Sequence, residues 1–224
     1  MRRVSKVIVA LGVVAAVLGI VLTCYGLVTK AAAEALLKDL TKLKVGTSTE
    51  ADAEQFSREH KRFLVSRICE QDYCVTDFKI QNRWLSVLKL EPPAEFDANF
   101  TVRAGKVTRI GGMLARSMPI YPTFSASAGM VDEYSEFPPH IAASEAHYQF
   151  PTPVGKPYLA VILDSQASAV QREHAFAFSF RCLVKPGWGC DLPCDYLPLA
   201  WQDWKAKLRD DFDGSYPKSA RCPH

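Results

Sequence analysis

The sequence lacks a strong excess of charge of either sign. Its 224 residues include 27 basic and 24 acidic side chains, which gives a formal net charge of +3. The first 30 residues contain four of the basic residues (Arg2, Arg3, Lys6 and Lys30) and no acid, so residues 31–224 carry a net charge of −1. Nucleic-acid binding requires a basic patch or stripe, and the sequence has no such stripe with interleaved aromatics. We therefore exclude nucleic acid as a partner.

Several motifs of known chemistry are also missing. The sequence has no G-x-S-x-G turn that would present a nucleophilic serine, and Gly111-Gly112 lacks the flanking pattern of a phosphate-binding loop. The segment from His140 to His147 has neither the H-E-x-x-H spacing nor the helical context of a zinc site. We therefore predict no catalytic residue, no cofactor and no metal ligand.

The most informative segment is a long uncharged run from Val7 to Val28. At a rise of 1.5 Å per residue, this run makes a helix of roughly 33 Å, enough to cross a bilayer core of about 30 Å. Its Val, Ile and Leu residues favour insertion by on the order of 5 kcal/mol. Basic residues precede the run without any acid, which favours a cytoplasmic tail. We predict a signal anchor that spans the cell membrane once, with the rest of the chain periplasmic or extracellular.

Cleavage of this anchor is an open alternative. The run is longer than the apolar core of about 7–15 residues found in cleaved signal peptides, which favours an uncleaved anchor. The small residues Ala31-Ala32-Ala33 nevertheless offer a signal peptidase site, with cleavage after Ala33. Cys24 lies within the run after Thr23, a poor residue before a lipid-modified cysteine, so we interpret it as an inert thiol in the membrane.

Six cysteines follow the anchor and indicate a disulfide framework in an exported domain. They are Cys69, Cys74, Cys182, Cys190, Cys194 and Cys222. Cys69 and Cys74 are close in sequence and have no nearby competitor, which predicts a bridge worth roughly 2 kcal/mol. The other four are expected to pair among themselves, in an order that the sequence leaves open. Cys190 and Cys194 have one more residue between them than a thioredoxin-type pair, which favours a structural disulfide. A membrane-tethered thiol–disulfide or other enzyme that uses this pair is the alternative.

Hydrophobic periodicity predicts an α+β fold in which two short helices precede a mainly antiparallel sheet with disulfide-stapled loops. The anchor helix is expected to continue over residues 31–44, either as a stalk or as the first packed helix of the domain. Thr47 and Glu50 have the spacing of a capping box, which predicts a second helix that ends near Arg62.

Strand signals begin after the second helix. They predict strands at residues 78–81, 85–90, 99–103 and 107–113, with Ala104-Gly105-Lys106 as the turn of a hairpin between the last two. Further strands are predicted at 124–130, 147–150, 158–163 and 175–182, with the last two paired across residues 164–173. A short amphipathic helix follows at 201–209.

We divide the chain at composition changes. Residues 1–30 form the tail and anchor, 31–116 a helix–helix–β-meander subdomain, 117–210 a proline-rich β subdomain with a cysteine-rich loop, and 211–224 a loose tail. Four aromatics gather near the C-terminal cysteines: Trp188, Tyr196, Trp201 and Trp204. They fit an exposed recognition patch or the small core beneath a disulfide-pinned loop, and we favour the core.

The segment KLKVGTSTEADAEQF, followed by a meander that ends in FTVRAGKVTRI, resembles small bacterial envelope proteins. These are the SmpA/OmlA lipoproteins that assist outer-membrane β-barrel assembly, and the β-lactamase-inhibitor-like fold that they share. The resemblance covers about residues 40–112 and rests on a Gly-Thr helix start and a strand–Gly-Lys–strand hairpin. The chain departs from the pattern by having a membrane helix in place of a lipobox, and no Gly-Pro after the second helix. The resemblance implies a non-catalytic binding or envelope-assembly module, with a protein of the envelope as its partner, and it transfers no functional residue.

Overall fold

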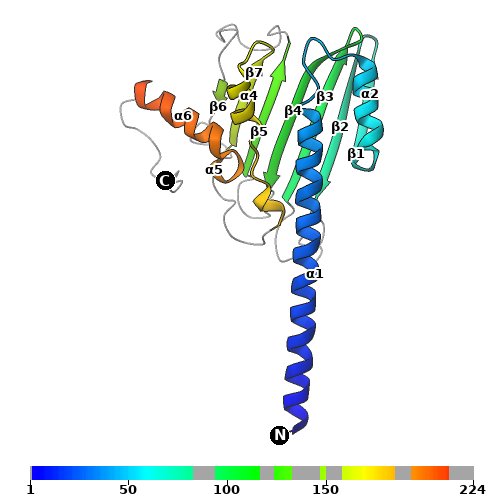
Figure 1. Cartoon of the computed structure of the whole chain (residues 1–224), viewed down its shortest axis with the longest axis vertical. Helices are drawn as coiled ribbons and strands as arrows, with labels where there is room; N and C mark the ends of the chain where they lie inside the picture. The colour runs from blue at the N-terminus through cyan, green and yellow to red at the C-terminus, as the bar shows by residue number, and fades with distance from the viewer. Residues whose placement is uncertain are drawn as a thin grey trace.

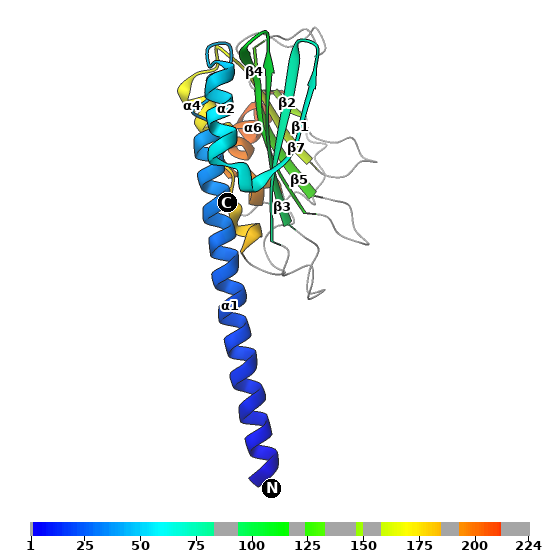
Figure 2. The same cartoon turned by 90° about the vertical axis from the view of Figure 1, so that its right-hand side faces the viewer.

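The longest element is the helix α1 (Arg2–Leu40), an uninterrupted helix of 39 residues. The computed structural model describes residues 2–82, 94–116, 124–132, 147–149, 158–184 and 193–211. The N-terminal part of α1 projects away from the other elements, and its C-terminal part lies on a sheet (Figures 1 and 2). The stretch Val9–Leu40 is long and apolar enough to cross a membrane, as a signal sequence also would be.

The two parts of α1 have different surroundings. Most large apolar side chains between Val9 and Val28 are more than half exposed, whereas Ala33, Leu36 and Leu40 are fully buried. The predicted continuation of the helix beyond the anchor is confirmed. Of the two alternatives for this continuation, the structure shows the packed helix and not a stalk.

The second helix, α2 (Glu50–Glu59), begins later than predicted. Its N-cap is Thr49 and not Thr47, so the predicted cap is wrong. A turn around Gly46, whose φ is +80°, occupies the preceding residues, and the Ser48 N–H donates to the Lys44 carbonyl at 2.8 Å. The helix can start only after this turn. The Thr49 hydroxyl accepts from the Asp52 N–H, and the Asp52 carboxylate accepts from the Thr49 N–H at 2.7 Å. This second bond lowers the pKa of Asp52.

A seven-stranded sheet follows, in the order β1-β2-β3-β4-β5-β7-β6. All neighbouring strands are antiparallel except β5 and β7, which are parallel. The α+β class is therefore confirmed. The strands are β1 (Leu64–Glu70), β2 (Tyr73–Gln81), β3 (Ala94–Arg103), β4 (Lys106–Arg116), β5 (Phe124–Val131), β6 (His147–Gln149) and β7 (Tyr158–Asp164). Since β4 pairs with β5, one sheet runs across the boundary at residue 116 between the two predicted subdomains.

Most strand predictions are confirmed, and so is the hairpin between β3 and β4, where Arg103 pairs with Lys106. The predicted strand at 85–90 lies outside the described residues. The sequence analysis missed β1, which follows the short 3-10 helix η1 (Lys61–Phe63). Nearly all side chains of β1 are exposed, so it has no apolar alternation to detect. The predicted Cys69–Cys74 disulfide is confirmed and joins directly paired residues of β1 and β2.

The predicted strand at 175–182 is wrong. This segment contains the end of α4 (Ala169–Ala175), a short connection, and the 3-10 helix η3 (Phe180–Leu183). In the sequence AFAFSF, every second residue is a phenylalanine. These phenylalanines pack on the core without forming a strand: Phe176 and Phe180 are buried, and Phe178 is half-buried. The predicted pairing with β7 is therefore also wrong, and the edges of β7 are taken by β5 and β6.

The last described elements are α5 (Pro193–Tyr196) and α6 (Pro198–Asp211), and α6 confirms the helix predicted at residues 201–209. The edge-on view in Figure 2 shows the helices on one face of the sheet. Two aromatic clusters pack between these layers. The Phe56 ring of α2 meets the Phe78 ring at 5.2 Å, and the Phe96 ring of β3 meets the Phe180 ring at 4.9 Å.

The position of the α2 cap can be tested with two variants of the full chain. We expect Thr49→Ala to lower the free energy of unfolding by about 1 kcal/mol, because it leaves a helix N–H without an acceptor. Thr47→Ala is the matched control and should change it by only a few tenths of a kcal/mol. Urea unfolding followed by circular dichroism measures both. A larger loss in Thr47→Ala would contradict the observed cap.

Candidate functional site

A cleft of about 420 Å³ opens where α1 and the segment from α4 to η3 stand apart on the sheet. Its floor is formed by Ile110 of β4 and Met130 of β5, which are both buried. The two helical walls add further apolar side chains: Leu37, Phe176, Ala177, Phe178 and Phe180. The cleft exists because α1 covers only part of the sheet. The next helix on this face, α4, follows β7 and begins at its N-cap Ser168, so a gap is left between the two helices.

Charged and polar side chains surround the mouth of this cleft. Lys38 and Glu34 extend from α1, and Arg172 and Glu173 extend from α4. Glu34 pairs with Lys30 at 3.5 Å, and Arg172 Nε donates to the Ala167 carbonyl at 2.8 Å. Within the described part of the chain, the side chains of Lys38 and Glu173 have no ion-pair partner.

The lining of the cleft is mostly apolar. An apolar floor with a few polar groups at its edge is typical of small-molecule sites, which measure about 300–1,000 Å³. None of its described lining residues is a histidine, a cysteine or a serine. The cleft therefore offers an apolar surface with charged groups at its edge.

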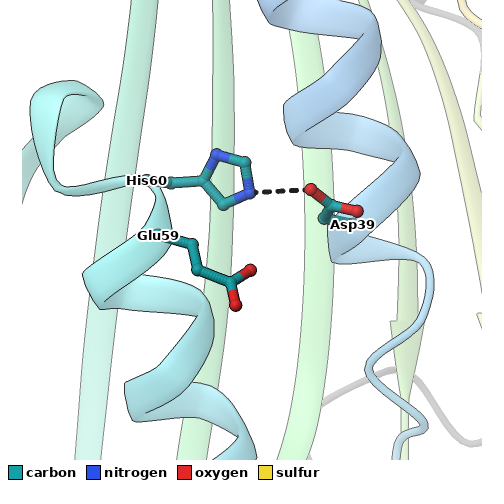
Figure 3. Close-up of side chains that lie close together, drawn as sticks. All are labelled: Asp39, Glu59 and His60. Carbon is teal, nitrogen blue, oxygen red and sulfur yellow. Dashed lines mark hydrogen bonds and ion pairs between the residues drawn. The ribbon is translucent and has the colours of Figure 1, made fainter.

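A second cluster lies where the C-terminal ends of α1 and α2 meet. Figure 3 shows His60, at the C-cap of α2, pointing toward Asp39 of α1 with Glu59 beside them. His60 Nε2 lies 3.1 Å from Asp39 Oδ2. The ligand atoms of the three residues all lie within 4.8 Å of one another. His60 is only 8% exposed, and its ring centroid is 4.6 Å from that of Phe56.

Lys42 completes this cluster on its solvent side. Its Nζ donates to Asp39 Oδ1 at 2.7 Å. This bond is the main cause that lowers the pKa of Asp39, with a smaller contribution from His60. The same bond raises the pKa of Lys42. The cluster therefore holds the Asp39 carboxylate between Lys42, in the turn after α1, and His60, at the end of α2.

Comparison with known proteins finds no relative. No family model, curated protein or solved structure matches this chain. Its function must be argued from its own geometry, and the resemblance of residues 40–112 to the SmpA/OmlA proteins stays a prediction.

The sequence analysis missed both sites. The cleft residues come from five elements (α1, β4, β5, α4 and η3), and the predicted strand at 175–182 gave no indication that its phenylalanines line a cleft. Asp39 and His60 are 21 residues apart and have no motif spacing. The one available signal is that His60 follows Ala53 and Phe56 on the apolar face of α2.

The residues singled out from the sequence lie elsewhere. Tyr196 and Trp201 are 0% and 2% exposed and belong to the hydrophobic core. For these two residues, the structure agrees with the core interpretation and not with an exposed recognition patch. Trp188 and the side chain of Trp204 lie outside the described part of the structure. Cys182 and Cys194 are both disulfide-bonded, while Cys190 and Cys222 lie outside the described residues. Cys24 is free and exposed.

A charged cluster lies on the face of the sheet opposite the helices. Lys79 Nζ of β2 is 3.3 Å from Asp97 and 3.2 Å from Glu95, both on β3. Burial raises the pKa of Asp97, although Lys79 acts in the opposite direction. Ionisation of Asp97 therefore costs stability in the folded state.

This cost predicts a pH dependence. Just above the ordinary Asp pKa of about 3.9, the folded state binds more protons than the unfolded state, so the unfolding free energy falls as pH rises. The Asp97→Asn variant cannot ionise at this position, so its unfolding free energy should not fall for this reason as the pH rises. Urea unfolding of both proteins between about pH 4 and pH 7 measures the difference. A wild-type protein that gains stability relative to the variant over this interval would disprove the assignment.

Proposed function

We propose that the protein is a single-pass membrane protein whose extracytoplasmic domain is a non-catalytic binding module. The cleft between α1 and α4 would bind an apolar or amphipathic ligand. The observation that carries this proposal is the cleft itself, with buried apolar side chains on its floor and charged groups only at its mouth. One of its walls belongs to the same helix that would enter the membrane.

The contacts of α1 support membrane insertion with the domain resting at the bilayer surface. A Cβ atom built on Gly26 would lie 3.0 Å from Val184 Cα, so the chain after η3 packs closely on this part of α1. Thr29 is also buried. The segment left for lipid runs from Val7 to about Tyr25, a helical length of about 28 Å. This length fits the bilayer core without an intervening linker.

The same contacts support an uncleaved anchor. Thr29 and Ala33 are buried against the domain, so cleavage after Ala33 would remove residues that cover its apolar core. The disulfides support an extracytoplasmic location, because disulfides persist in oxidising compartments. The basic residues before the anchor support a cytoplasmic N-terminus.

The height of the cleft sets what it can reach. Its α1 residues run from Glu34 to Lys38, and Thr41 follows the helix end. Glu34 lies about 13 Å along the helix beyond Tyr25. The cleft thus lies above the lipid surface, where it can receive the apolar part of a membrane component or of an envelope protein that projects from the bilayer.

Membrane embedding predicts a defined mass and thiol count. Intact protein purified from membranes should retain residues 1–33 and should expose one alkylatable thiol, Cys24, before reduction and seven after it. Denaturing alkylation with mass spectrometry measures this. Seven reactive thiols without reduction would place the domain in a reducing compartment, and loss of residues 1–33 would show a cleaved signal sequence.

Ligand binding in the cleft can be tested by photocrosslinking in native membranes. A photoreactive benzoylphenylalanine in place of Thr41, at the cleft mouth, should form an adduct of defined mass. Ala177→Trp would fill the cleft and should reduce this adduct at least fivefold.

Val170→Trp is the matched control, because Val170 lies on α4 with 60% exposure and does not line the cleft. It should leave the adduct unchanged. The mass of the adduct distinguishes a lipid from a protein. An adduct that persists in Ala177→Trp, or the absence of any adduct at Thr41, would disprove cleft binding.

A further inference from the structure

We propose that Asp39, Glu59 and His60 form a binding site for Zn²⁺ that links α1 to α2. This site is separate from the cleft, and its chemistry does not depend on what the cleft binds. The three side chains come from the last turn of α1 and from the end of α2 (Figure 3).

The donor atoms have the character that zinc prefers. Zn²⁺ binds imidazole nitrogen and carboxylate oxygen, and sites with three protein ligands keep a fourth position for water. Mg²⁺ and Ca²⁺ prefer sites made only of oxygen, so a buried imidazole disfavours them. One histidine with two carboxylates therefore indicates a borderline transition metal such as zinc.

The geometry needs little rearrangement. In a tetrahedral site with bonds of about 2.0–2.1 Å, neighbouring ligand atoms lie about 3.3 Å apart. His60 Nε2 and Asp39 Oδ2 already lie 3.1 Å apart. The His60 ring is fixed by burial and by the Phe56 ring. The exposed Glu59 carboxylate, within 4.8 Å of both other ligand atoms, can close the remaining gap through side-chain rotation.

Metal binding replaces interactions that the cluster already makes. Zn²⁺ would bind the Nε2 lone pair of His60 and so would replace the hydrogen bond between His60 and Asp39 Oδ2. Lys42 donates to the other oxygen of Asp39. Its side chain is 68% exposed and can turn into solvent, but its positive charge opposes the metal. Lys42 is therefore expected to weaken zinc binding.

The structure provides a matched control for this site. His174 Nδ1 of α4 lies 2.7 Å from Asp203 Oδ2 of α6, which is a second histidine–carboxylate pair between two helices. No third ligand completes this pair among the described residues. The His174–Asp203 pair has the same kind of hydrogen bond as the His60–Asp39 pair, but it lacks a third metal ligand.

The test uses the full chain in detergent, without an affinity tag, titrated with Zn²⁺ against a chromophoric chelator. Wild type should bind one Zn²⁺ per chain with a dissociation constant in the micromolar range, and zinc should raise its melting temperature. His60→Gln and Asp39→Asn should each weaken binding roughly tenfold or more. Glu59→Gln should weaken it severalfold, Lys42→Met should tighten it severalfold, and His174→Gln should leave it unchanged.

Several outcomes would overturn the site. These are a wild type that binds no zinc below millimolar concentration, an unchanged affinity in Glu59→Gln, and an equal loss in His174→Gln. His60→Gln removes a buried side chain and can impair folding, so its melting temperature without zinc must be measured. If that variant is unfolded, Glu59→Gln and Lys42→Met decide, because both side chains are exposed.

Discussion

The structure depends on one helix whose two parts have different surroundings. Over its first described part, α1 exposes its large apolar side chains and is long and apolar enough to cross a membrane or to act as a signal sequence. Over its last part, the same helix buries only one stripe, including Leu36 and Leu40, against the sheet. Because no break separates the two parts, the hydrophobic burial that holds the domain together also fixes the domain relative to the apolar first part of α1.

The other helices are arranged around α1. The His60–Asp39 pair ties α2 to the end of α1, and the His174–Asp203 pair ties α4 to α6. The space between α1 and α4 is then left over the centre of the sheet, where β4 and β5 present Ile110 and Met130. The cleft is thus left because the helices do not cover the whole face of the seven-stranded sheet. The charged groups at its mouth belong to α1 and α4, the two helices that border it.

What could be predicted from the sequence was carried by local signals. The uncharged run, the Ala104-Gly105 turn and the Cys69–Cys74 spacing each depend on neighbouring residues. The failures come from tertiary context. The strand β1 is an exposed edge without alternation, and the phenylalanines of 176–180 alternate because an irregular segment inserts them into the core. The turn at Gly46 moved the α2 cap from Thr47 to Thr49. Both sites join residues far apart in the chain, and no spacing rule connects them.

The close contact between Gly26 and Val184 has a mechanical consequence. A domain on a flexible linker of ten residues would wander by about 17 Å from its attachment point. In the proposed membrane arrangement, α1 would connect the domain to the bilayer rigidly, so the domain would keep one height above the bilayer and move mainly by lateral diffusion, rotation about the helix axis and tilt. Encounters with other molecules of the same membrane would then be confined to a thin layer, which would raise the effective concentration of any partner held at that height.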